Sequence, residues 1–332
     1  MDPRAEMELG QVITVRGLIP ADELGVTLPH EHILIRHQGP LVDTVDPLLA
    51  SEELRSFARF GGRTVVDMTN IGLQRDATVL RQVSAQTSVH IVMGTGYYKD
   101  GWLPAEAHAL TVDEMTALMV NEIADGVPAG DGGEPIRAGV IGEMGVSRPI
   151  TPTEERALAA AARAQHRTGV AINVHFDIGG ASAELNHAVD ILEHEGADLN
   201  RVVLDHFICR PDEVALCQQL VSRGCYIEFD LYGQEKWAKI YDLTKGTPPE
   251  VQVASLRWFI SAGLLDRILI SQDVANLVTL SRYGGYGRTH ILKNLVPMFN
   301  HYGITAKHLH TVMVENPKRL FPIQRASVRR AR

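Results

Sequence analysis

The chain has 332 residues, 45% of them hydrophobic, and a net charge of -8 at pH 7. This length and composition allow a large buried core. The net negative charge, with acidic and basic residues interspersed, argues against a nucleic acid or an anionic membrane as the main partner. The N-terminal stretch has no apolar core and no run approaches 18 apolar residues, so we expect neither a signal peptide nor a membrane-spanning helix.

The cysteines and the C-terminal residues predict the redox compartment and the state of the C-terminal tail. Cys209, Cys217 and Cys225 are evenly spaced, and an odd number at this spacing fits neither a disulfide framework nor a zinc knuckle. We therefore expect reduced thiols in a cytoplasmic protein. Residues 322–332 end in a cluster of arginines, which we expect to form a solvated tail.

Short runs rich in valine, isoleucine and leucine alternate along the chain with longer stretches that suit helices. Most of these runs are almost continuously apolar, which is typical of parallel strands buried on both faces. We predict strands at residues 26–35, 63–69, 89–95, 139–143, 170–175, 201–206, 225–230 and 267–273.

The stretches between these runs carry helix signals. Residues 154–168 are amphipathic, with start signals at 151–153 (TPT) and a stop signal at Gly169. We expect a second such helix at 183–195 and a final one near 306–315.

Eight strands that alternate with helices match a closed (β/α)8 TIM barrel. The alternative, a doubly wound open sheet, would need a Gly-rich phosphate-binding turn after the first strand, and the sequence has none. Residues 12–17 indicate a small N-terminal β-element that caps the barrel floor, and 125–135 a surface loop. No linker divides the chain, so we predict one domain over residues 1–332, with its core at about 25–321.

His30 and His32 form an H-x-H triplet at the end of the first predicted strand. Residues two apart on a strand project to the same face, so both imidazoles point into the barrel and Glu31 points away. Converging neutral imidazoles suit a borderline divalent ion, with zinc, cobalt and manganese as candidates. The triplet alone is a weak signal, because histidines at this spacing also occur in ordinary cores.

Three further candidate metal ligands lie at the ends of later predicted strands. His175 and His206 end two successive predicted strands, and Asp273 ends the last one. A single strand-end histidine is more often a packed core residue than a ligand, but equivalent positions on several strands favour one shared site. A carboxylate beside a nucleophilic water also serves as its general base, so Asp273 is the candidate catalytic residue as well as a ligand.

Glu143 ends the fourth predicted strand. Two divalent ions about 3.5–4 Å apart need an anionic bridge that offsets their repulsion. On its own Glu143 would be interpreted as an exposed carboxylate, but beside the other five candidates it is the expected bridge. Tyr97 and Tyr98 follow the third strand, and we expect one of them to line the substrate pocket; a packing role is the alternative.

The motifs that carry these residues resemble the phosphotriesterase family of the amidohydrolase superfamily, and most closely its phosphotriesterase-related branch. The resemblance runs from about Gly25 to Phe321 and includes the two strand-end histidines. Its other motifs are residues 27–32 (TLPHEH), 94–98 (GTGYY), 140–145 (VIGEMG), 283–287 (YGGYG), 290–292 (HIL) and 315–317 (ENP).

The resemblance implies a barrel with a binuclear metal centre and a bridging hydroxide as the nucleophile. His30, His32 and Asp273 would hold the more buried ion, and His175 and His206 the more exposed one. Barrels of this family commonly pair, which implies a homodimer.

Two departures from the family pattern concern the substrate. Organophosphate- and lactone-hydrolysing members carry a carboxylated lysine at the position of Glu143, whereas the related branch uses a glutamate there. This chain has no lysine between Lys99 and Lys236. The loop after the eighth strand passes quickly from Asp273 to the turn at 284–287, without the long lid segment of the lactonase members.

The sequence therefore predicts a hydrolase with two divalent ions, most simply zinc, that cleaves a small ester, lactone or amide and has promiscuous organophosphate activity. Metal-activated water attacks all of these bonds in the same way, so the ligands predict the machinery and not the substrate. An N-acyl amide substrate remains an alternative. A metal-containing barrel that binds a ligand without turnover, and a mononuclear site that leaves Glu143 uninvolved, also remain open.

Overall fold

The computed structural model of the chain describes residues 8–36, 44–177, 182–234 and 248–325. Eight strands form a parallel sheet in which β3 to β10 follow one another in chain order. The strands are β3 (Val26–Glu31), β4 (Gly62–Asp67), β5 (His90–Thr95), β6 (Val140–Val146), β7 (Ala171–Phe176), β8 (Val202–Leu204), β9 (Tyr226–Phe229) and β10 (Ile268–Ile270).

The last strand returns to the first and closes the barrel. Ser271, which follows β10, donates its hydroxyl to the carbonyl of His30 in β3 at 2.7 Å. The Asp273 amide donates to the same carbonyl at 3.3 Å. The predicted (β/α)8 barrel is confirmed, and the open doubly wound sheet is excluded.

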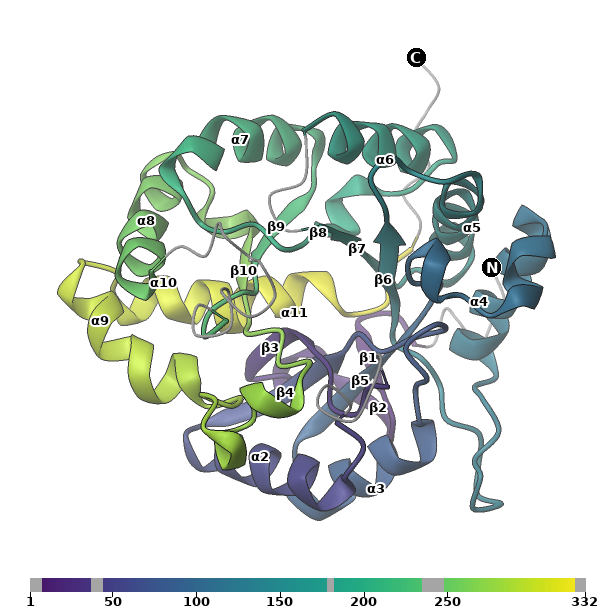
Figure 1. Cartoon of the computed structure of the whole chain (residues 1–332), viewed down its shortest axis with the longest axis horizontal. Coiled ribbons are helices and arrows are strands. Elements are labelled where there is room, and N and C mark those ends of the chain that lie inside the picture. Colours follow the sequence, from purple (N-terminus) through teal and green to yellow (C-terminus); the bar gives the residue numbers. More distant parts are fainter. Residues whose placement is uncertain (1–7, 37–43, 178–181, 235–247, 326–332) are drawn as a thin grey trace.

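Helices follow the strands and surround them (Figure 1). Because both faces of the sheet are covered, its strands are largely apolar and buried, as the sequence indicated. The helices are α2 (Pro47–Arg59), α3 (Ala77–Thr87), α4 (Val112–Ala124), α5 (Pro152–Thr168), α6 (Ser182–His194), α7 (Val214–Arg223), α8 (Pro249–Ser261), α9 (Val296–His301), α10 (Ala306–His310) and α11 (Asn316–Leu320).

The ends of α5 follow its sequence signals. The Thr151 side chain accepts from the amide of Glu154, whose carboxylate in turn accepts from the Thr151 amide. The helix ends at Gly169, whose φ of 75° lies in the left-handed region that glycine adopts without strain. The final helix is longer than predicted, because a π turn at Thr311–Glu315 leads directly into α11.

The N-terminal β-element forms the floor of the barrel, as predicted. Strands β1 (Gln11–Thr14) and β2 (Gly17–Pro20) form an antiparallel hairpin. Val12 and Ile19 of this hairpin pack into a buried cluster with residues of the barrel strands. The hairpin also pairs with Ile323, whose amide donates to the Gln11 carbonyl at 2.9 Å.

The remaining sequence predictions concern cysteines, membrane spans and the tail. Cys209, Cys217 and Cys225 are buried and free, as expected. Among the described residues, no helix combines the length and the apolar character that crossing a bilayer requires. The arginines of the predicted solvated tail beyond Arg325 lie outside the described residues.

Candidate metal centre

The Glu143 carboxylate lies at the centre of the predicted ligands and is 2% exposed. Its Oε1 is 3.1 Å from His32 Nε2. Its Oε2 is 2.8 Å from His175 Nδ1 and 3.8 Å from His206 Nε2. The two carboxylate oxygens thus face different imidazoles, which is the arrangement that a bridge between two cations needs.

The other five candidates fall into two sets on either side of Glu143. Asp273 Oδ1 lies 3.5 Å from His32 Nε2 and 3.8 Å from His30 Nε2. His175 Nδ1 and His206 Nε2 face each other at 2.6 Å. The structure therefore brings together all six side chains that the sequence singled out, in the grouping that the resemblance implied.

Some of these residues lie at other places relative to the strands than the sequence predicted. His30, Glu143 and His175 lie within β3, β6 and β7. The predicted strands 201–206 and 267–273 were too long, because β8 ends at Leu204 and β10 at Ile270. His206 and Asp273 instead lie in the following loops.

The backbones of His206 and Asp273 have φ values of 57° and 48°, in the left-handed region. A non-glycine residue held there costs about 1–3 kcal/mol, and such residues gather at functional sites. Hydrogen bonds hold the turn at His206, because its amide donates to Asp230 Oδ1 at 3.1 Å. Neither turn has a signal in the sequence.

Carboxylates behind the imidazoles orient three of the four histidines. His30 Nδ1 lies 3.0 Å from Asp205 Oδ2, and His206 Nδ1 lies 3.1 Å from Asp230 Oδ1. His32 Nδ1 lies 3.0 Å from the hydroxyl of Thr69, which donates to Asp67. A partner on one ring nitrogen fixes the tautomer and leaves the other nitrogen free for a metal.

The sequence analysis assigned no role to these supporting residues. The available signal was position, because Thr69 and Asp230 end predicted strands and Asp205 directly precedes His206.

Glu31 points away from the metal cluster, as the strand geometry predicted, and it holds the loop that carries Asp273. Its Oε1 accepts from the Gln272 amide and its Oε2 from the Val274 amide, both at 3.1 Å. The backbone amides of both sequence neighbours of Asp273 are therefore held by one buried carboxylate. Arg288 Nε lies 3.5 Å from Glu31 Oε2 and balances its charge.

The two tyrosines have different surroundings. The Tyr98 hydroxyl lies 3.3 Å from His175 Nε2, and its ring meets Trp102 edge to face. Tyr97 is 1% exposed and packs in the main hydrophobic core. The structure thus places Tyr98 at the site and gives Tyr97 the packing role that the sequence left as the alternative.

The titrating groups and donor atoms of the cluster fit divalent cations. Burial raises the pKa of Glu143, but the imidazoles of His175 and His32 outweigh it, so this pKa lies well below its usual range. Burial raises the pKa of Asp273 to about 6. Both ring nitrogens of His30 are buried without a hydrogen bond of good geometry to the described residues, although Nδ1 lies 3.0 Å from the Asp205 carboxylate. Ionised carboxylates around unpaired imidazole nitrogens are the donors that zinc and similar ions prefer.

Two hollows flank the cluster at the mouth of the barrel. One of about 180 Å³ is lined by His206, Phe207 and Arg210 among others. A wider one of about 510 Å³ is lined by Asn70, Trp102 and their neighbours. The smaller hollow reaches the cluster at His206, and the larger one is bounded by Asn70, whose side-chain amide donates to the Glu143 carbonyl.

Known proteins are similar to this chain in sequence and in structure. The Phosphotriesterase family model matches residues 10–321. An N-acetyltaurine hydrolase of Danio rerio is 33% identical, over 93% of this chain and 97% of that protein.

Among solved structures, a resiniferatoxin-binding protein from Rhodobacter sphaeroides has a TM-score of 0.85 and 34% identity, over 95% of this chain and 96% of that one. A lactonase from Listeria monocytogenes has a TM-score of 0.82 and 27% identity, over 95% and 99%. The chain therefore belongs to the phosphotriesterase family of binuclear metal-dependent hydrolases, as its motifs indicated.

Proposed function

We propose that this protein hydrolyses a small amide, ester or lactone with two divalent metal ions, and that N-acyl amides are its main substrates. The observation that carries the proposal is the position of Glu143, whose two carboxylate oxygens face the imidazoles of His32 and His175. Zinc suits the mixed imidazole and carboxylate donors best, and cobalt or manganese would also fit them.

When bound, the two ions supply hydroxide at neutral pH, because together they lower the pKa of a shared water. His30, His32 and Asp273 would hold the more buried ion, and His175 and His206 the more exposed one. The Asp273 carboxylate accepts the proton of the attacking water and passes it toward the leaving group. The Tyr98 hydroxyl lies 3.3 Å from His175 Nε2 and orients that ring, and Tyr98 remains our candidate for contact with the substrate.

The preference for amides has two supports. The zebrafish relative, which matches nearly the whole chain, is named as a hydrolase of an N-acyl amide. Glu143 stands where the organophosphate- and lactone-hydrolysing members have a carboxylated lysine. We expect lactone and organophosphate hydrolysis as weaker, promiscuous activities. Because the similar Listeria protein is named as a lactonase, lactones are included among the substrates to be assayed.

A substrate panel tests the proposal. The purified protein, loaded in turn with zinc, cobalt and manganese, is assayed on N-acyl amino acids, N-acyl aminosulfonates, lactones, aryl esters and paraoxon. We expect the highest kcat/KM on one of the N-acyl classes. Turnover of lactones above that of every amide would reassign the substrate, and no turnover of any class would overturn the assignment as a hydrolase.

The second candidate is a barrel that binds a ligand without turnover, because the Rhodobacter structure is named for toxin binding. The variant Asp273→Asn separates the two. A hydrolase should lose about 10²–10⁴-fold in kcat and retain ligand affinity, because the proton acceptor is lost. A pure binder shows no turnover before or after the change.

Compartment and assembly complete the proposal. The three buried, free cysteines support a reducing compartment, and we propose the cytoplasm. We also propose a homodimer, in keeping with the family resemblance. Light scattering of the purified protein tests the dimer, and a monomeric mass would contradict it.

A further inference from the structure

Arg288 is a buried arginine that joins the two chain segments carrying the proposed ligands of the more buried ion. It lies in the chain after β10, and its side chain is 0% exposed. Its Nη2 donates to the carbonyl of His32 and, at 3.1 Å, to the carbonyl of Val274. His32 is itself a proposed ligand, and Val274 directly follows another, Asp273. One side-chain nitrogen therefore connects the residue after β3 to the loop after β10.

The Nε atom of Arg288 faces Glu31. It lies 3.5 Å from Glu31 Oε2, and both side chains are completely buried. The same carboxylate oxygen accepts from the Val274 amide at 3.1 Å. Val274 is thus held at its carbonyl by the arginine and at its amide by the glutamate. Because Glu31 lies between His30 and His32 in the chain, this pair fixes the loop against the segment that carries both histidines.

The backbone of Arg288 is anchored as well. Its amide donates at 3.0 Å to Oε2 of Glu53, a residue of α2 that is 5% exposed. The side chain of Gln272 accepts from the Ile291 amide at 3.2 Å and donates to the Gly287 carbonyl. The turn that carries Arg288 is therefore held both by α2 and by the loop after β10.

These contacts set the spacing between two groups that would bind the same cation. His32 Nε2 and Asp273 Oδ1 are 3.5 Å apart. The Asp273 backbone has a φ of 48°, which a non-glycine residue keeps only when its surroundings hold it there. Metal ligands have to stay within about 0.5 Å of their productive positions, and the residues behind them supply that precision. Loss of the Arg288 contacts would allow the loop to move away from His32.

We propose that Arg288 is a positioning residue of the metal centre, which fixes the spacing between His32 and Asp273 and so strengthens the binding of the more buried ion. The inference rests on the proposed function, because it presupposes the two ions. Since its side chain is fully buried, Arg288 acts through its neighbours and not by contact with the substrate. Lysine should not replace it, because a guanidinium presents its nitrogens in one rigid plane, whereas an ammonium is a single point charge on a flexible chain.

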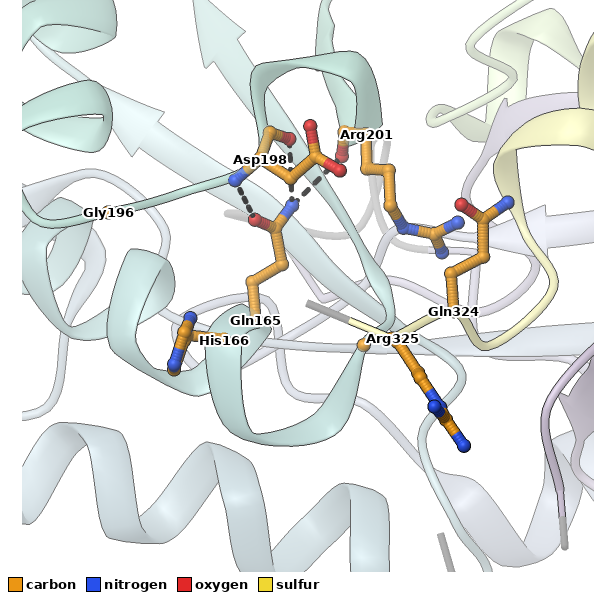
Figure 2. A pocket seen from close by; sticks show the side chains of 8 residues that line it. Gln165, His166, Gly196, Asp198, Arg201, Gln324 and Arg325 are labelled. Carbon is orange, nitrogen blue, oxygen red and sulfur yellow. Dashed lines mark hydrogen bonds between the residues drawn. The ribbon is translucent and has the colours of Figure 1, made fainter. Parts of the chain in front are cut away.

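Arg201 provides the matched control, because it is the only other arginine of the described residues that is buried, at 3% exposed. It precedes β8 and so lies at the end of the strands away from the metal cluster. Its Nη2 donates to the Pro322 carbonyl at 2.7 Å. The Gln165 side chain donates to the Arg201 backbone carbonyl at 3.2 Å (Figure 2). Arg201→Lys therefore disturbs a buried arginine of the same barrel without touching His32 or the loop of Asp273.

Competition with a chromophoric chelator, resolved into the two equivalents of zinc, tests the proposal on the unchanged protein, Arg288→Lys and Arg201→Lys. We expect Arg288→Lys to bind one equivalent about 10–100-fold more weakly and the other normally. Arg201→Lys should bind both normally, even where its Tm falls as far as that of Arg288→Lys. The visible absorption of the cobalt-loaded protein reports coordination geometry, which a loss of stability alone does not alter. It should change in Arg288→Lys and stay the same in Arg201→Lys.

A double variant covers the case in which Arg288→Lys does not fold. Glu31→Gln combined with Arg288→Met leaves no buried charge unpaired, and the same weakening of one equivalent is expected, because the contact with the two carbonyls is lost.

The possible outcomes separate this inference from the proposed function. Two normally bound ions in the Arg288 variants, or an equal loss of affinity in Arg288→Lys and Arg201→Lys, would overturn the inference and leave the proposed function intact. An unchanged protein that binds no metal would overturn both.

Discussion

His30 Nδ1 lies 3.0 Å from Asp205 Oδ2, and both side chains are completely buried. This contact sets the direction of the His30 ring, because it turns Nε2 toward Glu143 and Asp273. A ring held in this way needs no reorganisation when it binds a metal, and it is more basic than a free imidazole. Asp205 therefore supports the metal centre without being one of the proposed ligands.

The variant Asp205→Asn should weaken metal binding by about 10–100-fold, because the amide cannot stabilise the same His30 tautomer. Competition with a chromophoric chelator measures this affinity. Asp212→Asn is the matched control, since Asp212 is exposed and its carboxylate pairs with Arg210 on the surface. Equal affinities in Asp205→Asn and the control would show that the contact does not support the metal site.

Glu143→Gln should lower the metal content from about two equivalents per chain to about one, because the neutral amide no longer offsets the repulsion between two cations. Elemental analysis after gel filtration measures the content, and kcat should fall with it. If the unchanged protein carries one equivalent of metal, and Glu143→Gln alters neither the metal content nor kcat, the mononuclear alternative is favoured instead.

Metal binding should weaken as the pH falls below about 6. In the protein without metal, burial raises the pKa of Asp273 to about 6. A carboxylate must be ionised to hold a divalent cation, so protons compete with the cation below this pH, whereas above it Asp273 is ready to bind. Competition with a chelator in overlapping buffers measures the affinity. An affinity that stays constant from about pH 7 to well below about pH 5 would exclude Asp273 as a ligand.

Thr151→Ala should lower the free energy of unfolding by about 1 kcal/mol, because the α5 amide of Glu154 loses its acceptor. Urea unfolding followed by circular dichroism gives the difference. Thr151→Ser keeps the capping oxygen and should stay within a few tenths of a kcal/mol of the unchanged protein. A loss of similar size in Thr151→Ser would point to the methyl group rather than the cap.

The sequence predicted the barrel and its candidate site because both depend on periodic or local signals. Continuous apolar runs indicated parallel strands. Because all strands of the barrel have their C-terminal ends at the same face, His30 and His175 lie in one cluster although they are far apart in the chain. The turns at His206 and Asp273 were missed, because their left-handed backbone depends on contacts with Asp230 and Glu31 that form only in the fold. The uneven roles of Tyr97 and Tyr98 likewise depend on which face of the loop packs inward.

Anomalous diffraction from crystals grown with zinc, recorded on both sides of its absorption edge, tests the central claim most directly. We expect two peaks about 3.5–4 Å apart, one beside His32 and Asp273 and one beside His175 and His206, with the Glu143 carboxylate between them. A single peak, or two peaks that Glu143 does not contact, would contradict the bridged centre on which the proposed hydrolysis depends.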